Sequence, residues 1–123
     1  MFRAVQNKLL STPISGKYVF KPPTKEYTMS IKVILFRRVP AEKVNDIQPL
    51  LIEMRSLAMA QRGYISGETL MNEDDPEEYL VISSWTTKSR WNEWFENDKR
   101  IEIQGRIDRL LGRKTMYQVY YNA

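Results

Sequence analysis

The sequence predicts a single α+β domain in which strands and helices follow in the order β-α-β-β-α-β. Three patterns predict this order. Residues 31–36 alternate as in a strand, an apolar stripe recurs at spacings of three and four over residues 44–58 as in a helix, and two strand-like runs flank the turn 72–77. A chain of 123 residues, 42% of them hydrophobic, is long enough for one such domain with a modest core.

The first predicted strand, residues 31–38, is apolar on both of its faces. Odd and even positions alike carry large apolar side chains, namely Ile31, Val33, Leu35, Ile34 and Phe36. A strand with this pattern is usually covered on both sides in the folded protein. The helix that follows has Pro40 at its start and Gly63 just beyond its end, where these residues are favoured.

Residues 64–71 and 78–85 are predicted to pair as a hairpin, because residues 72–77 between them form turns and contain no core-forming side chain. The acidic residues of this turn could instead suggest a calcium loop. We interpret the segment as a solvated turn, because the glycine and the alternate-residue spacing of a calcium loop are missing.

A second helical region begins at Thr87, which is placed to cap it, breaks near residues 97–98 and ends at Gly112, before a last strand over residues 115–121. The resulting order is that of the ferredoxin-like fold, a four-stranded antiparallel sheet with helices on one face. The other face would be exposed although it is apolar. We therefore expect a homodimer in which two sheets pack together as a dimeric α/β barrel.

Residues 1–30 differ from the domain, residues 31–123, in net charge and in their proline and glycine content. They contain five basic residues and one acidic residue, whereas the domain contains fourteen of each. Prolines and a glycine interrupt them, so we expect a basic extension that packs across the molecule or onto a partner subunit, with an organelle transit segment as the alternative. The neutral domain offers no obvious phosphate-binding face, and we expect no nucleic-acid partner.

The chain contains no cysteine and no histidine. Their absence excludes disulfides, thiol nucleophiles, Cys/His zinc sites, histidine-ligated haem and imidazole acid/base catalysis. No apolar run approaches the roughly 20 residues that a membrane span needs, and the first residues do not resemble a secretory signal. We expect a soluble cytoplasmic protein without a membrane partner.

Three segments carry a resemblance to a known family. They are Arg62-Gly63-Tyr64, Asp74-Asp75-Pro76-Glu77-Glu78-Tyr79 and Trp85-Thr86-Thr87-Lys88-Ser89-Arg90-Trp91-Asn92-Glu93-Trp94. Over about residues 31–121 the chain resembles the antibiotic biosynthesis monooxygenase (ABM) superfamily, whose fold is a dimeric α+β barrel. The resemblance implies an oxidoreductase that binds a small aromatic or quinol substrate between sheet and helices.

Some members of that superfamily oxygenate their substrate without metal or flavin, since an electron-rich phenolate can itself pass an electron to dioxygen. The resemblance thus implies a monooxygenase without a bound cofactor. A noncatalytic small-molecule-binding or dimerisation module on the same fold is the alternative. An open cavity beside Trp85 would favour the enzyme, whereas side chains of Trp85, Trp94 and Leu35 that fill this space would favour the module.

The resemblance places Trp85 at the substrate pocket, and Trp85 is the expected catalytic residue, with its indole stacked on the substrate and its N–H free to donate. Of the two helical tryptophans, Trp91 and Trp94, we expect one in the core and one in the pocket wall. The expected pocket residues are Leu35, Trp85, Trp94, Gln104 and Arg38.

Arg37 and Arg38 end the first strand on opposite faces, and a guanidinium group there could hold a phenolate or a carboxylate. Arg38 is the one we place at the pocket. The tyrosines of the last strand are expected at an interface. They are Tyr117, Tyr120 and Tyr121.

Haem cleavage, which occurs in another branch of this fold, is not expected. The haem-ligating histidine of that branch falls at Gln104, and its first-strand asparagine falls near Leu35. A glutamine amide is a poor iron ligand. We therefore expect neither a metal nor a haem site.

Overall fold

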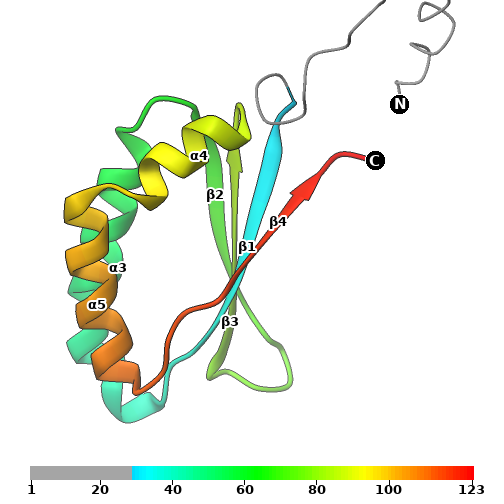
Figure 1. Cartoon of the computed structure of the whole chain (residues 1–123). Helices are drawn as coiled ribbons and strands as arrows, with labels where there is room; N and C mark the ends of the chain where they lie inside the picture. The colour runs from blue at the N-terminus through cyan, green and yellow to red at the C-terminus, as the bar shows by residue number, and fades with distance from the viewer. Residues whose placement is uncertain (1–28) are drawn as a thin grey trace, which may run out of the picture.

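The computed structural model describes residues 29–123, which form one antiparallel sheet with helices on one face (Figure 1). The strand order is β2-β3-β1-β4. The elements are β1 (Ile31–Arg38), η2 (Ala41–Lys43), α3 (Val44–Met59), β2 (Tyr64–Met71), β3 (Glu78–Trp85), α4 (Lys88–Phe95), α5 (Asp98–Leu111) and β4 (Tyr117–Tyr121). The predicted β-α-β-β-α-β ferredoxin-like order is confirmed. The basic extension, up to residue 28, lies outside the described residues and stays a prediction.

Capping residues explain where the helices begin and end. Thr87 accepts a hydrogen bond from a backbone N–H at the start of α4, at 3.1 Å, and Asn97 does the same for α5 at 3.0 Å. Gly112 ends α5 with a left-handed φ of 72°, and Gly63, just before β2, has a φ of 85°. Residues with a Cβ rarely adopt these backbone conformations. The predicted break near residue 97 is therefore a new helix start.

The predicted hairpin of β2 and β3 is present. These strands pair antiparallel from Tyr64 opposite Trp85 to Met71 opposite Tyr79, with a register irregularity after Tyr64. The backbone N–H of Asn72 donates to the carbonyl of Glu78 at 2.9 Å and closes the turn. The acidic segment is thus a turn, as predicted.

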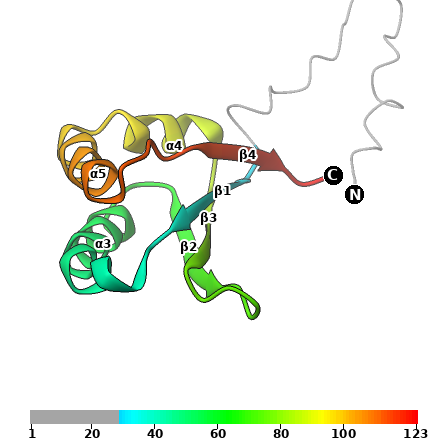
Figure 2. The same ribbon diagram turned by 90° about the horizontal axis from the view of Figure 1, so that it is seen from below.

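The helices cover only one face of the sheet, as the view from below shows (Figure 2). On the covered face, Ile31 and Val33 are each 2% exposed, whereas Phe36 on the other face is 57% exposed. Alternate residues of a strand point to opposite faces, so this contrast follows directly from position. One chain therefore covers only one face of β1, and the expectation that a second copy covers the other face stays a prediction.

The core has two parts. One is built around the tryptophans of β3 and α4, packed on the start of β1, and the other joins α3 to α5 through Ile47, Leu50, Ile103 and Ile107. Between residues 29 and 123, no helix has the length and apolar character needed to cross a lipid bilayer.

Candidate functional site

A cavity of about 300 Å³ lies between the covered face of the sheet and the three α-helices. This volume falls at the lower end of the range for small-molecule sites. Its wall includes exposed residues of α3, such as Gln48 and Ile52, and of β2, such as Glu68 and Thr69. The cavity therefore opens to solvent between α3 and β2.

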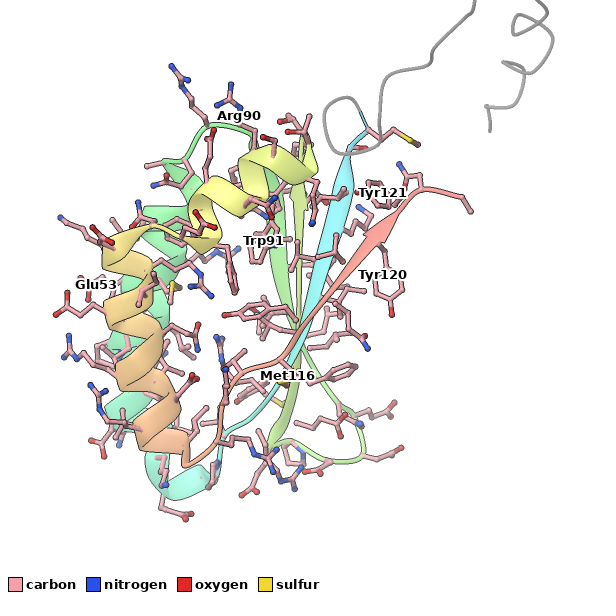
Figure 3. All side chains as sticks on the ribbon, viewed as in Figure 1. Glu53, Arg90, Trp91, Met116, Tyr120 and Tyr121 are labelled. Atoms are coloured by element: carbon pink, nitrogen blue, oxygen red, sulfur yellow. The ribbon has the colours of Figure 1, made fainter. Side chains whose placement is uncertain are left out.

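One end of the cavity, the aromatic end, is lined by Tyr64, Trp85, Trp91 and Trp94. The Trp85 and Trp94 rings are stacked at 6.4 Å between centroids and 21° between planes. Trp85 also meets the rings of Tyr64 at 5.4 Å and Trp91 at 5.7 Å in edge-to-face contacts. Figure 3 shows Trp91 between α4 and the sheet. The aromatic end offers a rigid apolar wall to a flat ligand.

Trp85 combines a structural position with a position in the cavity wall. It is 1% exposed, and its indole N–H donates to the Ser83 hydroxyl at 3.0 Å, two residues back on the same face of β3. The indole donor that we expected to be free for a substrate is thus engaged within the protein. What Trp85 offers to the cavity is its ring.

The neighbouring part of the wall, the basic end, contains Arg37 from β1, Arg100 and Gln104 from α5, and Tyr117 from β4. It adjoins the aromatic end, because the Tyr117 ring lies 5.6 Å from the Trp91 ring. Arg100 donates to the carbonyl oxygen of Phe95 at 3.0 Å and to the Tyr117 hydroxyl at 2.6 Å. Its guanidinium also lies 4.4 Å from the centroid of the Phe95 ring, a cation–π contact. Arg100 is thereby fixed between α5 and β4.

Gln104 is buried and fully engaged. Its Oε1 accepts from the Tyr117 hydroxyl at 3.0 Å, and its Nε2 donates to Asp108 Oδ1 and Thr115 Oγ1, both at 2.8 Å. An amide nitrogen has two hydrogens, and both are used here. Gln104 therefore orients Tyr117 and has no spare donor for a ligand.

Arg37 lacks such partners. It is 9% exposed, its side chain makes no hydrogen bond among the described residues, and its buried Nε is unsatisfied. Burial lowers the pKa of Arg37 and the charge of Arg100 adds to this, while Tyr117 and Asp108 oppose it. Burial likewise raises the pKa of Tyr117, so its hydroxyl stays protonated at neutral pH.

Four of the five predicted pocket residues, Leu35, Trp85, Trp94 and Gln104, line the cavity. Arg38 does not, and that placement is corrected. Its side chain points away from the helices and forms an ion pair with Asp75 at 2.8 Å. Leu35 and Arg38 are three residues apart, an odd number, so one strand cannot place both on the same face.

The structure also corrects two expectations about aromatic residues. Trp91 and Trp94 both line the cavity, although one was expected there and the other in the core. Of the β4 tyrosines expected at an interface, Tyr117 lines the cavity and Tyr121 packs against the core around the tryptophans. Tyr120 is 49% exposed and points away from the helices (Figure 3), so its place at an interface stays a prediction.

Sequence reasoning chose Arg38 over Arg37 for the pocket and missed Arg100 and Tyr117 as cavity residues. Two spacings would have found part of this set. Arg37 is two residues from Leu35 and shares its strand face, and Arg100 is four residues from Gln104 and shares its helix face. Nothing local in the sequence indicates that β4 brings Tyr117 to both of them.

Residues 29–106, more than half of the chain, match the family described as antibiotic biosynthesis monooxygenase. The chain belongs to this family. The match confirms the resemblance seen in the sequence. No curated protein matches the chain in sequence.

The chain is also similar in fold to several solved structures. A conserved protein from Methanosarcina mazei Go1 has a TM-score of 0.71 at 19% identity, over 78% of this chain and 95% of that one. Rv0793 from Mycobacterium tuberculosis has a TM-score of 0.67 at 16% identity, over 76% and 95%. SnoaB from Streptomyces nogalater, a cofactor-independent oxygenase, has a TM-score of 0.65 at 14% identity, over 78% and 94%. At these identities the likeness shows a shared α+β fold.

Proposed function

We propose that this ABM family member is a monooxygenase-type oxidoreductase that oxygenates a small aromatic or quinol substrate without a bound cofactor. The observation that carries the proposal is the cavity beside Trp85, since a ligand-free module would fill this space with Trp85, Trp94 and Leu35. Family membership supports the type of reaction. SnoaB, described as a cofactor-independent oxygenase, supports the absence of a cofactor.

In the proposed reaction, the substrate itself supplies the electrons. An ionised phenol makes its ring electron-rich enough to reduce dioxygen, which adds to a ring carbon. The ring C–H and the phenol O–H together lose two hydrogens, and the phenol becomes a quinone. One oxygen atom of O₂ becomes the new C=O, and the other leaves with the two hydrogens as water. The aromatic end would hold the ring flat and keep water from the reacting carbon. Trp85 is the proposed catalytic residue through its ring contact with the substrate.

Oxygen consumption with a panel of hydroquinones and polycyclic phenols, in the presence of a metal chelator, tests the proposal. We expect at least one substrate to be consumed faster than it autoxidises, and Trp85→Phe to slow this turnover because the smaller ring contacts the substrate less. Tyr120→Phe, which removes the hydroxyl of an exposed side chain on the open face, is the matched control. If no substrate is turned over and none raises the melting temperature, the noncatalytic module replaces this proposal.

We further propose that the protein acts in the cytoplasm as a homodimer whose open sheet faces pack together. The support is a set of large apolar side chains left uncovered on or beside that face. They are Phe36, 57% exposed, Leu70, 43%, Tyr120, 49%, and Met116, 72%. Exposed apolar surface of this extent commonly marks an interface. Sedimentation at micromolar concentration should give a dimer, and a stable monomer near 14.6 kDa would contradict it.

A further inference from the structure

We infer that the ligand of the cavity is an aromatic oxyanion, and that Arg37 binds its anionic oxygen beside Arg100. The inference rests on the proposed function, because it names the class of substrate for the same cavity. The anionic group is a carboxylate or an ionised phenol, and the two are distinguished below.

Arg37 is a buried cation without an acceptor. The ion pairs found among residues 29–123 involve the more exposed arginines, Arg38 with Asp75 and Arg90 with Glu93. Arg37, which is 9% exposed, forms no ion pair and leaves Nε unsatisfied. Burying an unpaired charge is unfavourable, and a guanidinium stays protonated at neutral pH. A bound oxyanion would supply the acceptor that the fold does not.

The charges around the cavity favour an anion. Arg37, Arg55 and Arg100 line it, whereas Glu68, at the mouth, is its only acidic lining residue among those described. The carboxylate of Asp108 also attracts Arg37 electrostatically, but it accepts hydrogen bonds from Gln104 and Thr115, both at 2.8 Å, and forms no ion pair with Arg37. The positive charge is therefore not neutralised by the protein at close range.

The arrangement of the two ends suits a ligand with a flat ring and an anionic group. Trp85 lies opposite Ile31, at the start of β1, and Arg37 lies six residues further along the same strand. Six residues of strand span roughly 20 Å between Cα atoms. Tyr117 bridges this span, because its ring lies 5.6 Å from the Trp91 ring and its hydroxyl accepts from Arg100 at 2.6 Å. A ring at the aromatic end can thus direct an oxyanion toward Arg37.

This arrangement also bears on how a phenol would ionise. Positive charge lowers the pKa of a bound phenol, so its O–H bond can break with the proton passing to water at the mouth. No carboxylate lines the deep part of the described cavity. The electrostatic effect of Arg37 and Arg100 would take the place of a side-chain base.

Binding of three probes tests the inference. We expect 2-naphthoate to bind at least tenfold more tightly than 2-naphthamide, its neutral analogue, because a charge-assisted hydrogen bond is lost with the amide. 4-Nitrophenol, whose absorbance reports its ionisation, tests the phenolate. A lowered pKa on binding assigns the site to phenolates as well, and an unchanged pKa restricts it to carboxylates.

Variants of the two neighbouring arginines provide the matched comparison. Arg37→Met should abolish the preference for naphthoate, and Arg37→Lys should keep part of it. Arg38→Met should keep all of it, because Arg38 lies on the other face. Arg37→Met should also melt at the same temperature as the wild type or higher, since it removes an unpaired buried charge. A merely structural arginine would lower the melting temperature when replaced.

Equal binding of the two naphthalene probes, failure of both to bind, or an Arg37→Met variant that still prefers naphthoate would overturn the inference. Its failure is distinguishable from failure of the proposed function. If naphthoate binds through Arg37 but no phenol is oxygenated, the anion site stands and the oxygenase does not. If neutral quinols are oxygenated equally well by Arg37→Met, the oxygenase stands and the anion site does not.

Discussion

The two faces of the sheet carry similar residues in very different surroundings. On the covered face, the Tyr117 hydroxyl donates to Gln104 at 3.0 Å within a buried network. On the open face, the Tyr120 hydroxyl donates to Gln118 at the same distance, but in solvent. The two hydrogen bonds have the same length, but losing the buried one leaves a polar group without a partner, whereas water can replace the exposed one. The buried bond therefore contributes more to the free energy of unfolding.

The neighbouring arginines show the same contrast. Arg38 is exposed and has an acidic partner, whereas the Nε of Arg37 is buried and has no hydrogen-bond partner. A fold usually pairs its buried charges before its exposed ones. The reversal of that order here indicates that the covered face is shaped for something besides its own stability.

Of the substitutions that test the contrast between the two faces, Trp85→Ala should have the largest effect on stability. Removing a ring that is 1% exposed should lower the free energy of unfolding by about 3–5 kcal/mol, through lost burial and the cavity left behind. Tyr120→Ala, on the open face, should cost far less. Urea unfolding of both variants at one protein concentration measures the difference, and equal losses would contradict the contrast between the faces.

Phe36→Glu should act on association and leave the covered face intact. In a twofold dimer both subunits carry the substitution, so two negative charges enter the interface. Their repulsion should raise the dissociation constant of the dimer about a hundredfold. Ile101→Glu, at a residue of α5 that is 52% exposed, is the control and should remain dimeric. Sedimentation over a concentration series measures both, and an unchanged dimer for Phe36→Glu would place the interface elsewhere.

Gln104→Leu tests the buried network. It leaves the Tyr117 hydroxyl and Thr115 without their glutamine partner and should cost about 1–3 kcal/mol of unfolding free energy. Gln118→Leu, the exposed counterpart, should stay within about 0.5 kcal/mol of the wild type. Thermal and urea unfolding check this pair, and a tolerant Gln104 would show that the network is dispensable.

The smallest effect concerns Asp75, at the hairpin turn. Its hydrogen bond from Arg38, helped by one from the Glu77 backbone, holds the pKa of this carboxyl below its usual value. The pair therefore contributes stability above about pH 4, and this contribution is lost as pH falls through the lowered pKa. The difference in unfolding free energy between wild type and Asp75→Asn should be small at neutral pH and shrink on acidification. If the difference between wild type and Asp75→Asn grew on acidification, the pKa of Asp75 would be raised in the folded protein and not lowered.

Periodicity was enough to predict the fold, because each element carries its own pattern and caps. The apolar stripe of α3, the turn between β2 and β3 and the cap at Thr87 are local features of the sequence. The covered face of β1 was harder to assign. Ile34 and Phe36 make the open face as apolar as the covered one, so hydropathy could not say which arginine faces the helices.

The candidate site was predictable at its aromatic end and not at its basic end. Trp85 and Trp94 lie on the segment that resembles the family, so the resemblance located them. The basic end depends on contacts between residues distant in the chain: Arg37 comes from β1, and the hydroxyl of Tyr117 reaches Arg100 seventeen positions earlier. Contacts of this kind are set by the tertiary fold and leave little trace in local spacing.

The crowding of indoles at the aromatic end gives the molecule a built-in optical reporter. The chain has three tryptophans, and all of them line one wall of the same cavity. Its entire tryptophan emission therefore originates within one small volume, and none arises from the open sheet face. A quinone or other aromatic acceptor entering the cavity would quench this fluorescence directly, while self-association through the opposite face would leave the emitting rings in unchanged surroundings.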